Sequence, residues 1–457
     1  MIKFNSTTAM SKPAAGRNVL RALVGCAMAL AFSAQAGIAE RAQRSNVAGI
    51  DVIVYPMDVP DVVTVLGTMP LGDAQQKAKA GNPAVPQLAS MLLQEGTTKH
   101  DKFQIAEILS GLGAEVDVSA GSSNVDIYGH GLTRDLDTVL GLIAEQLREP
   151  AFTQVELDKA KVQLEAMLRD AGDSADGRAS EALMLAVFPA SSPNAPIPRE
   201  QLLKAIPSVT IEQVRQFHAD YFGPAHMTLV FAGDVDAAKV GELVKRNFAG
   251  WSGGVDYVRG AAEAGNAITP PRSIAMQDKA TISVFWGEQT GLRFSDADYL
   301  PLSLGVGVLG SGFTGRLMSA VRTREGLTYG ITARLFGSDL GSGGFMINST
   351  FAPELLDKGI ASSRRELQTW WKDGITEQEL AARKKNLIGG YQVRLGSTVG
   401  MASALIGAVK RDVGLEWLDQ YPAQIEAATV AEVNGAIKKH IDPARLVEVK
   451  AGTFAKP

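Results

Sequence analysis

An internal repeat limits the fold of this chain more than any other feature of its sequence. The segment TIEQVRQFHADYFGPAHMTLVFAG, which starts at Thr210, aligns without a gap to TVAEVNGAIKKHIDPARLVEVKAG, which starts at Thr429. The identical pairs share one offset: Thr210, Val214, Pro224, Ala225, Val230, Ala232 and Gly233 match Thr429, Val433, Pro443, Ala444, Val449, Ala451 and Gly452. We therefore expect two copies of one structural unit.

Each copy predicts a helix followed by a strand. The threonine is a helix N-cap, and Gln213 or Glu432 three residues later completes a capping box. A proline ends the helix, and an alternating apolar stretch then predicts a strand that ends at glycine. A second pair of capping boxes, TQVEL at Thr153 and TEQEL at Thr376, opens a long helix in each copy. The repeated unit is therefore α+β.

The length and the repeat together indicate the domain organisation. A chain of 457 residues is too long for one compact core. The first copy is assigned to residues 37–248 and the second to residues 276–457, while the glycine- and alanine-rich stretch between them predicts a linker at 249–275. We expect an α+β fold with two homologous α/β-sandwich domains, related by tandem duplication, that face each other across a cleft.

The first 36 residues have the pattern of an export signal. Basic residues precede the apolar run ALVGCAMALAF, which is too short to span a membrane. Ala34 and Ala36 then form an A-x-A pattern, so cleavage after Ala36 is predicted. LVGC at 23–26 matches a lipoprotein box, but Cys26 lies inside the apolar run instead of after it. The prediction is a periplasmic protein with no membrane span after signal cleavage.

Cysteine content and charge exclude several classes of function. Cys26 is the only cysteine, so the mature chain has no disulfide, no thiol nucleophile and no cysteine metal site. The net charge is −4 and no long basic run occurs, which argues against nucleic acid as a partner.

The hexapeptide GSGFTG at 310–315 matches the glycine pattern of a dinucleotide-binding loop. That interpretation requires a strand before the glycines and a helix after them. The preceding stretch, DADYLPLSLGVGVLG, instead has the leucine and valine spacing of a helix. An acidic residue at a suitable distance, Asp339, does exist. The favoured prediction is a tight turn between two helices.

Two segments carry a resemblance to a known family. FAGDVDAAKVGELVKRNFAGW at 231–251 and GFTGRLMSAVRTREGLTYG at 312–330 are similar to the pitrilysin/insulinase family of zinc peptidases, which have an inverted H-x-x-E-H motif. The small bacterial, processing-peptidase-like members are the most similar. In the family, two histidines one helical turn apart bind zinc, and the glutamate between them activates the bound water.

The resemblance implies that the zinc site has been lost. EGT at 95–97 aligns AVPQLASMLLQEGTTKH with the metal helix, so Gln87, Ser90 and Met91 occupy the His, Glu and His positions. Met167 falls at the position of the more distant glutamate ligand, and the neighbouring Glu165 is expected to be a solvated helix residue. The five histidines of the chain form no i, i+4 pair, so no histidine metal site is expected in their place.

The second copy retains what the resemblance identifies as the substrate-binding pair. Family members carry an Arg and a Tyr seven residues apart, and here these are Arg322 and Tyr329. A guanidinium offers fixed donors to a substrate carbonyl, and a phenol can donate to a developing oxyanion. Arg324, two residues further along the chain, is an alternative candidate for the arginine of this pair. The alternative is structural: Arg322 in a surface ion pair and Tyr329 packed in a strand.

These features suggest a subunit without zinc in a heterodimeric peptidase. The partner would be an H-x-x-E-H-bearing paralogue that holds the zinc, and this chain would hold no cofactor. Arg322 and Tyr329 would act on an extended peptide, captured along a strand edge. The main alternative is a non-enzymatic peptide-binding or scaffold protein of the same fold. A peptidase active alone is disfavoured, since no G-x-S-x-G motif is present and the mature chain has no cysteine. A homodimer is an open alternative to the heterodimer.

Overall fold

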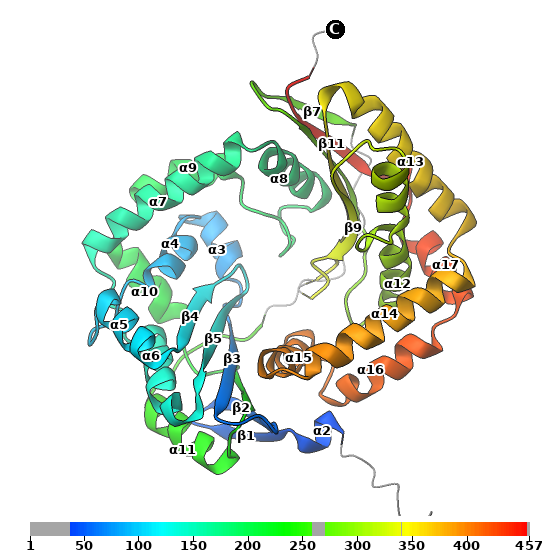
Figure 1. The fold of residues 1–457 in the computed structure, drawn as a ribbon. Helices are drawn as coiled ribbons and strands as arrows, with labels where there is room; N and C mark the ends of the chain where they lie inside the picture. The colour runs from blue at the N-terminus through cyan, green and yellow to red at the C-terminus, as the bar shows by residue number, and fades with distance from the viewer. Residues whose placement is uncertain (1–36, 258–269, 340, 455–457) are drawn as a thin grey trace, which may run out of the picture.

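The computed structural model describes residues 37–257, 270–339 and 341–454. The predicted signal peptide, residues 1–36, and the middle of the predicted linker lie outside the described residues. Figure 1 shows two α/β halves, each with its own sheet. Among the described residues, no helix combines the length and the apolar character needed to cross a membrane.

The first half contains a six-stranded mixed sheet in the order β1-β2-β6-β3-β5-β4. Only β2 and β6 pair in parallel; the other neighbours are antiparallel. Its strands are β1 Gln43–Val47, β2 Ile50–Pro56, β3 Val62–Pro70, β4 Glu115–Ala120, β5 Asn124–Leu132 and β6 Thr228–Gly233. Its helices are α2 Ile38–Arg41, α3 Ala74–Ala80, α4 Val85–Leu92, α5 Lys102–Leu112, α6 Leu136–Arg148, α7 Gln154–Asp173, α8 Ala175–Val187, α9 Arg199–Ala205, α10 Ile211–Tyr221 and α11 Ala237–Phe248, with 3₁₀ turns at Thr133–Asp135 and Ile206–Ser208.

The second half contains a five-stranded mixed sheet in the order β7-β11-β8-β10-β9, in which only β7 and β11 are parallel. Its strands are β7 Arg272–Ala275, β8 Ile282–Gln289, β9 Ile331–Phe336, β10 Gly344–Phe351 and β11 Val447–Gly452. Its helices are α12 Tyr299–Gly310, α13 Leu356–Asp373, α14 Glu377–Leu395, α15 Thr398–Arg411, α16 Glu416–Ala427 and α17 Val430–His440, with a π-helix, η3, at Met318–Arg324 and a 3₁₀ turn at Pro353–Leu355.

The repeat predicts the local structure well. The Thr210 and Thr429 capping boxes are both formed, and the helices that follow, α10 and α17, lead into β6 and β11. Thr376 also forms its predicted box. Thr153 caps α7 without a box, because the Glu156 carboxylate binds Lys102 and Lys159 instead of the Thr153 amide. The expectation of an α+β fold with two related halves is confirmed.

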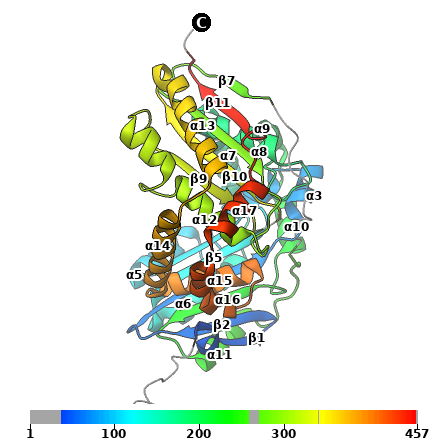
Figure 2. The same ribbon diagram turned by 90° about the vertical axis from the view of Figure 1, so that its right-hand side faces the viewer.

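The halves exchange a helix, which the sequence did not predict. One face of each sheet is covered by helices of its own half. On the other face of the second sheet lies α8 of the first half, where Leu183 and Val187 pack with Phe285 and Val449. The opposite face of the first sheet is covered by α15, and Figure 2 shows α15 and α16 beside its strands. The two halves are therefore interlocked.

The same sharp bend starts both exchanged helices. Ser174 caps α8 and Ser397 caps α15, each accepting the N–H of the glycine three residues later. A Cβ on Gly177 would lie 2.3 Å from the Ala171 carbonyl oxygen. Glycine is required because the new helix begins against the end of the preceding one.

Candidate functional site

The glycine hexapeptide forms a turn between two helices. Gly310 ends α12, and a Cβ on it would lie 2.2 Å from the backbone nitrogen of Ala333 in β9. Gly312 adopts a left-handed φ of 65°, which favours glycine. The glycines thus permit a close helix–strand contact and a tight turn into η3. The element before them is a helix, so the strand that a dinucleotide-binding loop requires is not there.

Backbone hydrogen bonds and a buried side chain hold the segment between Arg322 and Tyr329 in place. The Leu327 N–H donates to the Val321 carbonyl at 2.9 Å, and the Leu327 side chain is buried. The Thr328 hydroxyl donates to the Thr350 carbonyl at 2.7 Å and accepts the Gly330 N–H at 3.1 Å. These bonds anchor the residues before Tyr329, Leu327 to η3 and Thr328 to β10.

The two side chains of the predicted pair differ in exposure: Tyr329 is exposed, whereas Arg322 is partly buried. Tyr329 is 89% exposed and lies just before β9, so it is not packed in the strand. The Arg322 guanidinium lies 5.3 Å from the ring centroid of Phe313, which is itself 75% exposed. In the described part of the chain Arg322 forms no ion pair, whereas Arg324 contacts Glu366 at 3.3 Å. Arg324 therefore fills the structural role that was the alternative for Arg322.

The residues at the metal positions of α4 have structural contacts. The apolar face of this helix, Val85, Leu88 and Leu92, is buried, as is Leu93 directly after it. The Ser90 hydroxyl, predicted from the resemblance to lie at the glutamate position, accepts the N–H of Ala120 at 2.7 Å and so caps the last residue of β4. Met91 packs against the core of the first half.

The other two positions complete no metal site. Gln87 is exposed and lines a cavity of about 190 Å³ together with Pro83, Pro86 and Gly121. Met167 lies on α7, which packs against α4, but its side chain is 57% exposed. Across residues 37–257, 270–339 and 341–454, no group of three His, Cys, Asp or Glu side chains could hold a metal ion. An amide, a bonded hydroxyl and a thioether do not fit zinc.

The histidines have separate roles in the fold. His218 is partly buried and contacts the Leu147 carbonyl at 2.8 Å, and this burial lowers its pKa. The others contact different partners: His100 with Glu145, His130 with Thr64, His226 with Asp256 and His440 with Asp298. Glu165 forms an i, i+4 pair with Arg169 at 2.6 Å. These residues stabilise helices and turns and converge on no common point.

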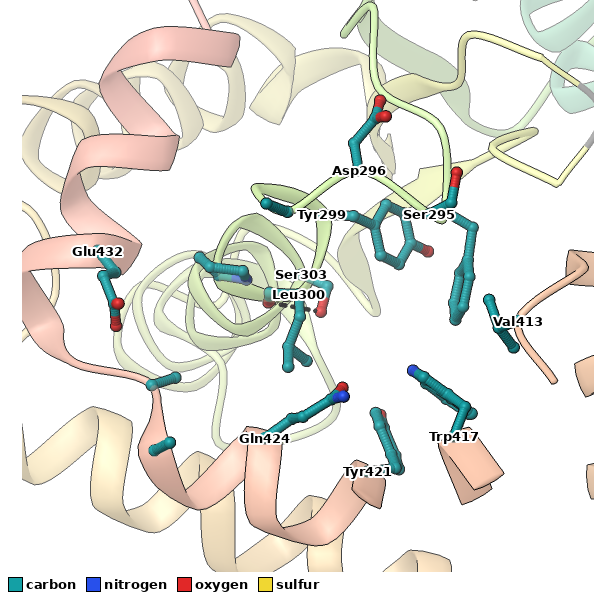
Figure 3. Close-up of a pocket in the computed structure, with 15 residues that line it drawn as sticks. Ser295, Asp296, Tyr299, Leu300, Ser303, Val413, Trp417, Tyr421, Gln424 and Glu432 are labelled. Carbon is teal, nitrogen blue, oxygen red and sulfur yellow. Dashed lines mark hydrogen bonds between the residues drawn. The ribbon is translucent and has the colours of Figure 1, made fainter. Parts of the chain in front are cut away.

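A second cavity, of about 570 Å³, lies beside the start of α12 (Figure 3). Neighbouring aromatic rings form its wall: the centroids of Phe294 and Tyr299 are 4.8 Å apart, and those of Trp417 and Tyr421 are 4.5 Å apart. Burial raises the pKa of both tyrosines, so their phenols are neutral. In Figure 3, Leu300 points into the same space. This lining suits an apolar side chain or small molecule and offers no nucleophile paired with a base.

Comparison with known proteins agrees with this geometry. The family profile described as "Peptidase M16 inactive domain" matches residues 208–387. An uncharacterized zinc protease of Mycobacterium tuberculosis is 26% identical over 362 residues, covering 77% of this chain and 79% of the relative. The "Non-peptidase homolog YmxG" of Helicobacter pylori is 23% identical over 368 residues, covering 78% of this chain and 81% of the relative.

Solved structures share the fold. The peptidase M16 inactive domain from Pseudomonas fluorescens has a TM-score of 0.80 at 24% identity, covering 91% of this chain and 99% of that one. The periplasmic protease PqqL from Escherichia coli has a TM-score of 0.71 at 14% identity, and the match covers 93% of this chain but 46% of PqqL. Fold, family profile and relatives agree: the chain is similar to peptidases and inactive domains of the M16 (pitrilysin/insulinase) family, and its sequence contains no H-x-x-E-H motif.

Proposed function

We propose that this chain is the zinc-free subunit of a two-chain peptidase and supplies Arg322 and Tyr329 to a zinc-bearing partner. The observation that carries the proposal is a contrast between the halves. The metal positions of the first half have become structural, as Ser90 does by capping Ala120. In the second half Tyr329 is exposed, and Arg322 in η3 is partly exposed and has no carboxylate partner among the described residues.

The length of a related protease supports a second subunit. This chain matches 46% of PqqL, so a protease of this fold can contain about twice the length of this chain. In the proposed assembly the remaining half is a separate polypeptide. That partner would bear the H-x-x-E-H motif and the zinc ion, which polarises water and a peptide carbonyl.

The residues of this chain would bind and orient the peptide. The Arg322 guanidinium can donate to a substrate carbonyl, and the Tyr329 phenol can donate to the oxyanion that forms at the scissile carbon. β9 follows Tyr329 directly and pairs only with β10, so it lies at the edge of its sheet. An extended peptide is proposed to run along β9. The corresponding edge strand β4 is less suitable, because the Ala120 N–H is already bonded to Ser90.

The first test is isolation of the partner. The tagged chain is purified from its native host, and co-purifying proteins are identified by mass. We expect an H-x-x-E-H-bearing relative in roughly equal amounts. The sequence pattern at Ala34 and Ala36 also leads us to propose that the pair is exported to the periplasm.

The second test compares two neighbouring arginines. In the reconstituted pair, Arg322→Ala is expected to lower the rate of peptide hydrolysis about 100-fold, by analogy with the loss of one oxyanion donor. Arg324→Ala is the matched control and is expected to change the rate little, because Arg324 is held by Glu366 on the surface. Equal rates for the wild type and Arg322→Ala would contradict the proposal.

A non-enzymatic peptide-binding or scaffold protein is the second candidate function. It is favoured by the name of the Helicobacter pylori relative, a non-peptidase homolog, and by the structural roles of the α4 residues. Under this proposal no zinc-bearing partner co-purifies. Arg322→Ala then weakens peptide binding, measured by fluorescence anisotropy of a labelled unfolded peptide, and no hydrolysis is detected in either protein.

A further inference from the structure

One carboxylate of the second half holds the first residues of the described chain. Asp419 on α16 accepts the N–H of Ile38 at 2.7 Å and the N–H of Ala39 at 3.0 Å. The two segments are 381 residues apart in the sequence, and Figure 1 shows α2 beside α16. Gly37, which precedes α2, has no side chain to cap these amides. Asp419 supplies that cap from the other half of the protein.

The backbone of Gly37 lies close to the same carboxylate. A Cβ added to Gly37 would lie 2.8 Å from the Asp419 Oδ2 atom and 3.0 Å from its Cγ atom. The nitrogen on the same Cα is about 2.5 Å from such a Cβ. The Gly37 nitrogen therefore lies within about 5 Å of the carboxylate. This is the distance over which an ammonium group and a carboxylate attract each other appreciably.

Asp419 has no cationic side chain as a partner. In the described segments no Lys, Arg or His forms an ion pair with it. The nearby Arg41 instead donates to the Pro56 carbonyl at 3.0 Å, and its guanidinium lies 4.8 Å from the ring centroid of Tyr55. The carboxylate is thus directed at backbone groups of residues 37–39 and is not neutralised by a side chain.

The predicted signal cleavage site falls at this point. The A-x-A pattern places the cut between Ala36 and Gly37. Hydrolysis of that peptide bond consumes one water and leaves a carboxylate on Ala36 and an amine on Gly37. The free amine has a pKa of about 8, so it is protonated at neutral pH. We propose that Asp419 is the receptor for the Gly37 ammonium, forming an ion pair that exists only in the processed chain.

This ion pair would stabilise the contact between the two halves of the protein. Ile38, Ala39 and Ala42 pack against the cluster in which Ile53 and Val230 of the first sheet meet the exchanged helix α15. Before cleavage the chain continues through Gly37 and carries no charge there. Export and cleavage would therefore add an electrostatic contact between the halves after the chain has left the cytosol.

The test compares two chain starts. One chain begins at Gly37, and the other begins at Ser33 and so retains SAQA ahead of an uncharged Gly37 amide. Denaturant unfolding of both chains is measured at pH 6.5. The chain that begins at Gly37 is expected to have a folding equilibrium constant about two- to fivefold larger, as for an exposed ion pair. When both chains carry Asp419→Asn, they are expected to be equally stable. Glu107→Gln on α5, a carboxylate away from Gly37, serves as the control substitution.

The pH dependence identifies the amine. The carboxylate raises the pKa of the ammonium in the folded state. The added stability is therefore present below about pH 8 and is lost as the pH rises through the folded pKa. Carboxylic acids and guanidinium groups ordinarily titrate far from this range. Glu288, whose pKa burial raises to about 7, is present in both chains and cancels from the difference between them. Burial raises the pKa of Tyr55 and takes that of Tyr391 to about 12. The charged and titratable groups around the site are Glu40, Arg41, Tyr55, Tyr391, Arg394 and Glu416.

Two results would overturn the proposal. The first is equal stability of the two chain starts at pH 6.5, or a difference that persists in Asp419→Asn. The second is an exported chain whose intact mass shows a first residue other than Gly37. Neither measurement uses peptide hydrolysis, so the outcome is independent of the proposed function.

Discussion

Single buried residues make the stability of this protein depend on pH, and Glu288 on β8 is the clearest case. Burial raises its pKa to about 7, and its Oε1 atom accepts the Asp442 N–H at 2.8 Å. Because the folded pKa exceeds the unfolded value of about 4.5, the folded state favours the neutral acid, and stability falls as the pH rises from 4.5 to 7.

Glu288→Gln keeps the acceptor and removes the ionisation. The variant is expected to gain stability relative to the wild type as the pH rises, by up to about 3 kcal/mol at pH 8 compared with pH 4.5. Urea unfolding at the two pH values measures this difference. A stability difference between variant and wild type that is the same at both pH values would show that ionisation of Glu288 is not responsible.

The candidate site shows what residue identity alone predicts. Gln87, Ser90 and Met91 exclude a zinc site by their chemistry, without any structure. The new role of Ser90 depends on Ala120, which lies 30 residues away and is brought close only by the fold. Likewise the sequence could not show that Arg324 forms an ion pair with Glu366, because Glu366 lies on a different helix.

At the scale of elements, the bends before α8 and α15 depend on glycine. A Cβ on Gly400 would lie 1.9 Å from the Arg394 carbonyl oxygen. Gly400→Ala is expected to destabilise the protein by about 2 kcal/mol or more, since the helix start must shift. Gly389 within α14 has open space around its Cα. Gly389→Ala is the matched control and is expected to stabilise by about 0.5–1 kcal/mol. Thermal or urea unfolding distinguishes the two, and equal effects would refute the steric explanation.

Element positions could be predicted more fully than element partners. The strands β5 and β10 have apolar patterns bounded by polar or glycine residues, which is the pattern that predicts a strand. The bends carried a signal that was missed: Ser174 and Gly177 are related to Ser397 and Gly400 by the same offset as Thr153 and Thr376. An apolar face on a helix predicts that this face is buried, but it does not show which sheet the helix packs against. The helix exchange therefore could not be predicted.

At the scale of the whole molecule, the helix exchange makes each half depend on the other. Without α15 the first sheet would expose Ile53, Tyr55 and Val230, which are all buried in the intact chain. Without α8 the second sheet would expose Phe285 and Val449. Contiguous apolar surface of this kind is unfavourable in water. The residue ranges 37–248 and 276–457 are therefore proposed to be structural repeats that cannot fold separately.

This dependence predicts how the protein unfolds. A protease site placed in the segment between Gly250 and Arg272 allows the chain to be cut without touching α8 or α15. The cut chain is expected to remain one particle in size-exclusion chromatography and to unfold in a single transition by both circular dichroism and tryptophan fluorescence. The first fragment expressed alone is expected to aggregate or remain unfolded, and co-expression with the second fragment is expected to restore it. Two separate transitions in the cut chain, or a folded monomeric first fragment, would mean that the exchanged helices contribute little to the stability of either half.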